Sequence, residues 1–336
     1  RMKHHPARAG LTRDTKAGPV WTGEVRANET ALLQPLAWKR PRRIFWNAHG
    51  DLFHESVPDA WIDRQFAVMA LTPQHTHMVL TKRPERMAQY VRFLCNRDDL
   101  VRDAARRIGC TLEASRDASI AVRQPLPNVW CGTSVEDQRA ADERIPHLLT
   151  TPAAVRFLSC EPLLGPVDLR TIYLRRNGQR ITELSNRLGD YVQPLTGNFT
   201  DSPRIDWVIA GGESGRDARP MHPDWARSLR DQCAAACVAF HFKQWGEWAP
   251  STPEAASGNP RSGWKCLAGH PHVAKAAELY PEAGAAFIEH MGKARAGRLL
   301  DGRTHDDFPG AVWIGEAGPQ PRRVTGKIIP EEEVPY

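Results

Sequence analysis

Residues 205–215 read IDWVIAGGESG, an apolar run that ends in a glycine-rich turn carrying a carboxylate. A run of about 4–8 apolar residues rich in β-branched and aromatic side chains is typical of a buried strand. The same pattern recurs at 43–47 (RIFWN), 75–81 (HTHMVLT), 128–134 (NVWCGTS), 154–160 (AVRFLSC) and 238–244 (VAFHFKQ). Because several of these runs are continuously apolar rather than alternating, they favour a parallel sheet covered on both faces.

Amphipathic stretches separate these runs and predict helices over 58–71, 84–95, 135–149 and 223–236. For 135–149 we expect Ser134 to be the N-cap, with Asp137 in the first turn. Strands that alternate with helices indicate βαβ units with right-handed crossovers. The predicted fold class is therefore α/β, a partial TIM-like barrel of parallel strands with a small C-terminal appendage.

The 336 residues divide into three predicted parts. Residues 1–40 lead into the barrel, 41–250 form it, and 251–336 form a linker and the appendage. Two polar insertions interrupt the barrel near 96–127 and 168–204. The stretch 251–263 (STPEAASGNPRSG) has the composition of a linker. Residue 1 is Arg rather than Met, so we expect further residues upstream.

Composition excludes several classes of protein. Hydrophobic residues make up 41% and charged residues 25% of the chain, which is typical of a globular protein and excludes general disorder. No run approaches about 18 apolar residues, so we expect no membrane partner. The net charge of +6 makes nucleic acid a candidate partner. Seven cysteines without disulfide-framework spacing indicate a reduced, cytoplasmic location. The oligomeric state stays open.

Polar residues follow every predicted strand. In βα barrels and open α/β sheets, ligands bind at the carboxyl ends of the strands. We therefore predict a ligand-binding rim made of residues from all six strand ends. Its members are Asn47, Asp51, Lys82, Thr133, Glu136, Glu161, Gly211, Gly212, Glu213, Ser214, Lys243 and Trp245.

The glycine-rich turn at 211–215 is the most distinctive of these strand ends. Paired glycines allow backbone N–H groups to approach a ligand closely, and Glu213 can accept from an amine or a ribose hydroxyl. The turn matches neither the GxGxxG dinucleotide motif nor the phosphate loop that ends in Lys-Ser/Thr. Trp245 lies beside a lysine, where an aromatic ring can stack on a base.

The cysteines and histidines give weaker signals. Cys160 has no neighbouring histidine in the sequence, so a buried strand cysteine is the simpler interpretation. Cys233 and Cys237 begin a CxxxCxxC spacing, but its third position is Phe240, which argues against a cluster. His75 and His77 share one face of a strand and are expected to be core or surface residues. A carboxylate–histidine metal site around 49–55 remains an alternative.

The ordered motifs resemble one known family. They are LTKRP (80–84), NVWCGTSVEDQ (128–138), ADERIPHLL (141–149), AAVRFLSCEPLLGPVDL (153–169), IDWVIAGGESG (205–215), ARPMHPDWARSLRDQC (218–233), FKQWGEW (242–248) and GRLLDGRTHDDFP (297–309). This series resembles the bacteriophage gp-thirty-seven/gp-sixty-eight family of uncharacterised proteins, which are classed as radical S-adenosylmethionine-like. The resemblance runs from about residue 38 to residue 309, apart from the two insertions.

The resemblance implies two cofactors in the intact parent protein, S-adenosylmethionine and a four-iron four-sulfur cluster held by three thiolates. Family members carry the cluster cysteines near their start, in a motif that ends in a Cys-Tyr-Ala-Glu-like run. We expect this chain to begin just after that motif. None of its seven cysteines replaces the missing ligands at suitable spacing, so this chain is expected to bind no cluster by itself.

The resemblance also divides the rim into two groups. The cofactor group is Asn47, Asp51, Gly211, Gly212, Glu213 and Ser214. The substrate group is Lys82, Thr133, Glu136, Glu161, Lys243 and Trp245. In radical S-adenosylmethionine barrels the end of the second strand commonly holds the cofactor amine through Gly-Gly-Glu, whereas this chain has His-Gly-Asp at 49–51.

Three functions follow from this sequence. The first is a radical enzyme, or its body without the cluster, that acts on a nucleic acid or a nucleotide. The second is a non-catalytic barrel that binds nucleic acid, consistent with the arginine-rich stretch 97–107. The third is a metal-dependent hydrolase that uses His49, Asp51 and Glu161.

Overall fold

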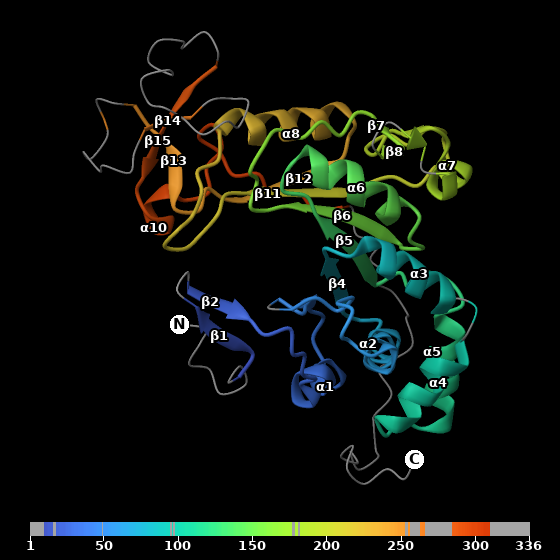
Figure 1. Ribbon diagram of the computed structural model, residues 1–336. Coiled ribbons are helices and arrows are strands. Elements are labelled where there is room, and N and C mark those ends of the chain that lie inside the picture. Colours follow the sequence, from blue (N-terminus) through green and yellow to red (C-terminus); the bar gives the residue numbers. More distant parts are fainter. Residues whose placement is uncertain are drawn as a thin grey trace.

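The computed structural model describes residues 10–15, 18–48, 50–94, 96, 98–176, 179–180, 182–252, 255, 263–265 and 284–309. Its centre is a six-stranded sheet that curls into a half barrel (Figure 1). The strands are β3 (Arg43–Trp46), β4 (Thr76–Thr81), β5 (Val129–Ser134), β6 (Val155–Cys160), β11 (Trp207–Gly211) and β12 (Ala239–Gln244). They lie side by side in chain order, and every neighbouring pair is parallel. The predicted parallel sheet is confirmed.

The four predicted helices are present as α2 (Asp59–Leu71), α3 (Pro84–Leu94), α6 (Gln138–Leu149) and α8 (Pro223–Ala235). The predicted start of α6 was wrong. Ser134 is the last residue of β5, and Asp137 is the N-cap because its side chain accepts a hydrogen bond from the Ala140 backbone N–H at 2.8 Å. Asp137 therefore caps the helix instead of belonging to its first turn.

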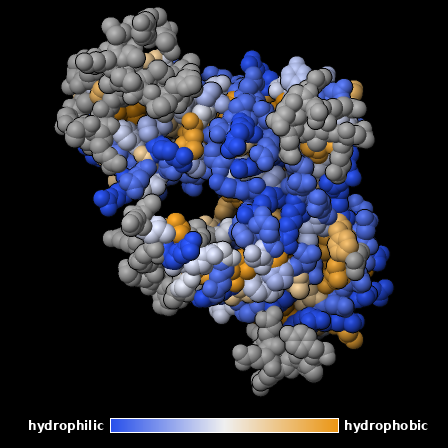
Figure 2. Space-filling model, viewed as in Figure 1, coloured by the Kyte–Doolittle hydropathy of each residue, from blue (hydrophilic) through white to orange (hydrophobic). Residues whose placement is uncertain are grey.

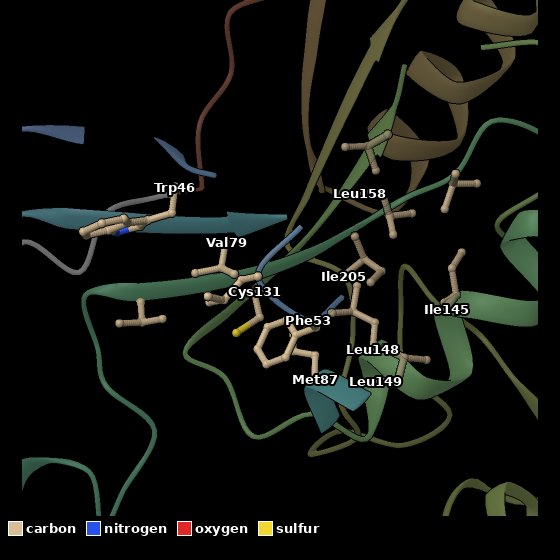
Figure 3. Close-up of a cluster of buried hydrophobic side chains, with 14 of the residues drawn as sticks. Trp46, Phe53, Val79, Met87, Cys131, Ile145, Leu148, Leu149, Leu158 and Ile205 are labelled. Atoms are coloured by element: carbon tan, nitrogen blue, oxygen red, sulfur yellow. The ribbon is translucent and has the colours of Figure 1, made fainter. Parts of the chain in front are cut away.

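Successive strand residues point to opposite faces of the sheet, and the outer face forms the main core. Val79, Cys131 and Leu158 lie on this face and belong to one buried cluster with Met87 of α3 and Leu148 of α6 (Figure 3). Burial of such side chains contributes about 1.5–3 kcal/mol each, and this packing holds the helices against the sheet.

The two insertions form small substructures of their own. Residues 96–127 hold α4 (Asp98–Arg107) and α5 (Leu112–Ala121), which pack against α2. Residues 168–204 hold the short strand pairs β7 (Ile172–Tyr173) with β10 (Tyr191–Val192) and β8 (Arg175–Arg176) with β9 (Gln179–Arg180), and α7 (Thr182–Leu188).

The ends of the chain flank the half barrel. A hairpin of β1 (Thr12–Thr15) and β2 (Gly18–Trp21) and helix α1 (Glu29–Ala37) precede the sheet. After it, β13 (Trp248–Pro250), β14 (Gly263–Lys265) and β15 (Ala286–His290) form an antiparallel sheet, followed by α10 (Lys293–Ala296). Most of the predicted linker 251–263 lies outside the described residues. In the described part of the chain, no helix has the length and apolarity to cross a membrane.

The inner, concave face of the half barrel has an aromatic floor. Trp130, Phe157 and Trp207 are buried there, and Phe308 from the end of the described chain packs on Trp207 at a ring-centroid distance of 4.4 Å. The segment 305–307 pairs antiparallel with β12 through a bridge between Asp306 and His241, and it leads Phe308 onto the floor. A distant C-terminal segment therefore closes one end of the half barrel.

Replacing Phe308 with alanine is expected to lower the free energy of unfolding by about 2–3 kcal/mol, because the ring leaves a cavity among aromatic side chains. Urea unfolding followed by tryptophan fluorescence measures this loss. The matched control is Phe199→Ala, since Phe199 is 81% exposed and should change stability by less than about 0.5 kcal/mol. Equal stabilities of the two variants would contradict the packing role of Phe308.

Candidate functional site

The carboxyl ends of the six parallel strands meet at one edge of the half barrel. The register shows how close they lie, because Ser134 of β5 is paired with Ser159 of β6. Glu136 and Glu161 each follow these serines by two residues, so they lie just beyond the ends of two neighbouring strands. The space-filling view shows a hollow between the appendage that holds β13 and the hairpin β1–β2 (Figure 2). β12 ends at this edge of the sheet, and the chain runs from it directly into β13 of the appendage that borders the hollow.

Two lysine–glutamate pairs dominate this edge. Lys82, just after β4, forms an ion pair with Glu136, and Lys243 of β12 lies with its Nζ 2.7 Å from Glu161 Oε2. Both carboxylate side chains are largely buried, 11% and 15% exposed, whereas the two lysine side chains are 57% and 54% exposed. The carboxylates are thus fixed in the wall, and the ammonium groups border the solvent.

Further donors fix the orientation of both carboxylates. Arg144 of α6 donates to Glu136 at 2.7 Å, and the Gln244 amide donates to Glu161 at 2.8 Å. Burial by itself would raise the pKa of Glu136, but the hydrogen bond from Lys82 and the charge of Arg144 outweigh it and lower that pKa. Glu136 is therefore an anion at neutral pH.

Asp51 lies at this edge but is fully engaged in structural contacts. Its carboxylate accepts from the Thr81 hydroxyl at 2.6 Å and from Lys82 N–H and Arg83 Nη1 at 3.0 Å each. It ties the loop after β3 to the end of β4. Asn47 is exposed, adopts a left-handed backbone with φ of 53°, and accepts from the Gln65 amide at 3.1 Å. Its side chain lies beside α2.

The two glycines of the glycine-rich turn lie against the loop that follows β12. A Cβ atom on Gly212 would lie 1.9 Å from the carbonyl oxygen of Trp245, so this glycine faces the neighbouring loop after β12 instead of a ligand. Gly211 similarly faces Gln244 and Glu161. The adjacent chain therefore fills the space on this side of both glycines, and the ligand contact expected of their backbone N–H groups stays a prediction.

The other two residues of the turn also have protein partners. Arg219 donates to both carboxylate oxygens of Glu213, and these hydrogen bonds hold the pKa of Glu213 below its usual value. Ser214 accepts from the Gln244 amide at 3.1 Å, which connects the turn to Glu161. Ser214 therefore belongs to the same polar network as the Lys243–Glu161 pair.

Thr133 and Trp245 do not face the hollow. Thr133 is fully buried, and its hydroxyl donates to the Thr81 carbonyl at 2.8 Å. Trp245 is 4% exposed, packs edge-on against Phe242, and donates its indole N–H to the Leu299 carbonyl. Its ring is part of the core, so the structure leaves it no face on which a base could stack.

Sequence reasoning missed three residues on the concave face near the rim. Ser134, Ser159 and His241 alternate with core residues along their strands, and that alternation was the signal that could have found them. His241 packs against Trp207, and burial together with Arg298 and Lys243 lowers its pKa. They form a polar band between the aromatic floor and the charged rim.

The described cysteines do not fit an iron–sulfur cluster. Cys131, Cys160 and Cys233 are buried in the core, and burial raises the pKa of Cys131 and of Cys233 to about 12. A thiolate ligand needs the opposite environment. Among the residues that the structure places, no three His, Cys, Asp or Glu side chains lie together as metal ligands. His49, part of the alternative metal site, lies outside the described residues.

Comparison with known proteins gives one match. A family model described as "Protein of unknown function (DUF5131)" matches residues 1–309. No curated protein and no solved structure matches the chain.

Proposed function

We propose that this chain, which belongs to the DUF5131 family of unknown function, binds S-adenosylmethionine at the carboxyl ends of its parallel strands. In this proposal the half barrel is of the radical S-adenosylmethionine type, and the substrate is a nucleic acid or a nucleotide. The observation that carries the proposal is the pair of adjacent ion pairs, Lys82–Glu136 and Lys243–Glu161, at neighbouring strand ends.

These two pairs suit a zwitterionic ligand. The aminocarboxyl end of S-adenosylmethionine carries one ammonium and one carboxylate. A fixed glutamate can accept from the ammonium while an exposed lysine swings to the carboxylate. Because an ion pair with an exposed lysine contributes only about 0–1 kcal/mol, exchanging it for a ligand costs little. Gln244 keeps Glu161 in place during this exchange.

The concave face can accommodate the rest of the ligand. Leu80 and Ile209 are half-buried and belong to the partly buried apolar residues around the aromatic floor. An adenine ring has apolar faces and would pack on such side chains, and the hydroxyls of Ser134 and Ser159 would reach its ribose. When bound, S-adenosylmethionine supplies an activated sulfonium. The cysteines described above do not fit a cluster, so no reaction step is assigned to one.

The proposed substrate class rests on charge. The chain has 45 lysines and arginines against 39 carboxylates, and Lys82 and Lys243 stand exposed at the edge of the hollow. Phosphates are attracted to such a rim.

Isothermal titration of S-adenosylmethionine into the wild-type chain and two variants tests the proposal. Glu161→Gln and Lys243→Met are each expected to weaken binding about tenfold or more, because each removes one charged hydrogen bond. The control is Lys39→Met, which removes an exposed lysine outside the rim. Methionine and adenosine, titrated separately, should bind far more weakly than the intact ligand. Absence of binding to the wild type, or equal affinity in all variants, would overturn the proposal.

A further inference from the structure

A second site lies on the helical hairpin α4–α5, which Figure 1 shows packed beside α2 and away from the strand ends. Between the two helices is a groove with a volume of about 400 Å³. Its lining residues are Arg102, Arg106, Leu112, Arg116, Ser119, Ile120 and Arg123. Four guanidinium groups therefore surround one groove, and none of the lining residues is acidic.

The groove is amphipathic as well as basic. Leu112 is 70% exposed and Ile120 is 48% exposed, although both are large aliphatic side chains. They lie two helical turns apart on the same side of α5, with Arg116 between them. Figure 2 shows apolar and charged side chains next to one another over these helices. Exposed aliphatic side chains flanked by arginines are typical of protein interaction surfaces.

Part of the arginine donor capacity is unused in this structure. The Nε atom of Arg102 is buried and has no hydrogen-bond partner among the described residues. Arg123 pairs with Asp98 at 2.7 Å, and Arg106 lies at 4.0 Å from Asp103 at the edge of the groove. The side chains of Arg106 and Arg123 are 49% and 62% exposed, so their guanidinium groups can donate to an incoming carboxylate.

The distribution of charge favours a protein segment over a nucleic acid. Residues 98–123 contain five arginines and five carboxylates, so the hairpin as a whole carries no net charge. A nucleic-acid strand that extended beyond the groove would meet those carboxylates, whereas a short segment seated in the groove would not. The groove also has no aromatic side chain in its lining, so bases would find no aromatic ring there to stack on.

We infer that the α4–α5 hairpin binds an acidic, amphipathic segment of a partner protein, with carboxylates on the arginines and apolar side chains on Leu112 and Ile120. Each helix of the hairpin has 10 residues and is about 15 Å long, which matches about three turns of a bound helix. This inference does not depend on the function proposed for the strand ends.

Fluorescence anisotropy with a labelled peptide tests the inference on the full chain. The probe is an amphipathic peptide of about 15 residues with glutamates on one face and leucines on the other. Arg102→Glu combined with Arg116→Glu is expected to weaken binding about tenfold or more. Leu112→Ser combined with Ile120→Ser leaves the charge unchanged and is expected to weaken it at least about threefold. The control is Arg139→Glu with Arg187→Glu, which makes the same change in net charge on α6 and α7 and should bind like the wild type.

Three results would overturn the inference. The first is no binding of the acidic peptide to the wild type. The second is equal binding by the groove variants and the control. The third is a combined result: a single-stranded oligonucleotide of about 20 nucleotides displaces the peptide, and the Leu112 and Ile120 substitutions leave the peptide affinity unchanged. Circular dichroism of each variant checks that the substitutions leave the fold intact.

Discussion

Replacing Gly212 with alanine is expected to lower the free energy of unfolding by about 3–5 kcal/mol. The new Cβ atom would lie 1.9 Å from the Trp245 carbonyl oxygen and 2.7 Å from its carbonyl carbon. These are backbone atoms, so no side-chain rotation relieves the overlap, and the two loops must separate. Overpacking of this kind costs about 1–3 kcal/mol, and the backbone hydrogen bonds lost with it add to that cost.

The loops at the ends of β11 and β12 meet at two glycines. Gly212 N–H donates to the Gln244 carbonyl at 2.9 Å, and Glu247 N–H donates to the Glu213 carbonyl at 3.0 Å. Gly246 has a φ of 82°, and a Cβ atom there would lie 2.0 Å from the Glu213 carbonyl oxygen. The contact therefore needs a glycine on each side.

Urea unfolding followed by circular dichroism measures the effect of Gly212→Ala. The matched control is Gly50→Ala, because a Cβ atom on Gly50 would meet nothing within 4 Å. We expect the control to stay within about 0.5 kcal/mol of the wild type. A Gly212→Ala protein that also stays within about 1 kcal/mol would show that the two loops move apart easily.

This contact bears on the candidate site because Gln244 joins the glycine-rich turn to Glu161. Its side-chain amide donates to Glu161 and to Ser214, while its backbone carbonyl accepts from Gly212. Separating the loops would therefore also free the Glu161 carboxylate from Gln244 and weaken its ion pair with Lys243. The glycines act by positioning the rim, and the rim side chains provide the binding groups.

The strands were predictable from sequence because each is a short apolar run bounded by a polar turn, and this signal is local. Connecting such units in chain order predicts which strands are neighbours, so the placement of Glu136 and Glu161 at one edge of the sheet was also predictable. The hydrogen-bond partners of these residues could not be predicted from the sequence. Asp51 is bound by Thr81 and by the backbone of Lys82, about 30 residues away, and an isolated carboxylate in a sequence does not reveal which donors surround it.

The segment 305–308 at the end of the half barrel also has partners that the sequence does not reveal. Phe308 packs on Trp207, which lies about 100 residues earlier in the chain. The residues around Phe308 show no strand pattern that would predict this contact. The neighbour of Gly212 could not be predicted for a related reason. A glycine pair indicates that something approaches the backbone closely, but only the tertiary structure shows that the Trp245 carbonyl does so.

His77 gives the second large effect, a loss of stability in acid. Its ring is fully buried. Trp46 Nε1 donates to His77 Nδ1 at 2.9 Å, and His77 Nε2 lies 3.0 Å from the Thr72 hydroxyl. That hydroxyl donates its own hydrogen to the Val68 carbonyl at 2.6 Å, so His77 must donate to it from Nε2. The network is complete with a neutral ring, and a proton on Nδ1 would face the Trp46 N–H.

Burial accordingly lowers the pKa of His77 from 6.5 to about 3, although a hydrogen bond at Thr72 acts to raise this pKa. In the unfolded chain the ring takes up a proton below about pH 6.5, whereas in the native protein it stays neutral down to about pH 3. The unfolded state therefore binds more protons in this window, and stability falls as the pH falls. The contribution of His77 is about 1.4 kcal/mol for each pH unit, or about 5 kcal/mol over the whole window.

Urea unfolding of the wild type and His77→Gln between pH 4 and pH 6 tests this expectation. Glutamine keeps one acceptor for Trp46 and one donor for Thr72 but does not titrate. The slope of the unfolding free energy against pH should therefore decrease by the contribution of about one bound proton. The matched control is His54→Gln, which makes the same substitution at a histidine that is 31% exposed and lies outside the network of Trp46, His77 and Thr72. Lower stability of His77→Gln at pH 8 would not affect this comparison, because the slope alone reports the proton. Identical slopes for His77→Gln and the wild type would show that His77 gains its proton in the folded protein as readily as in the unfolded chain.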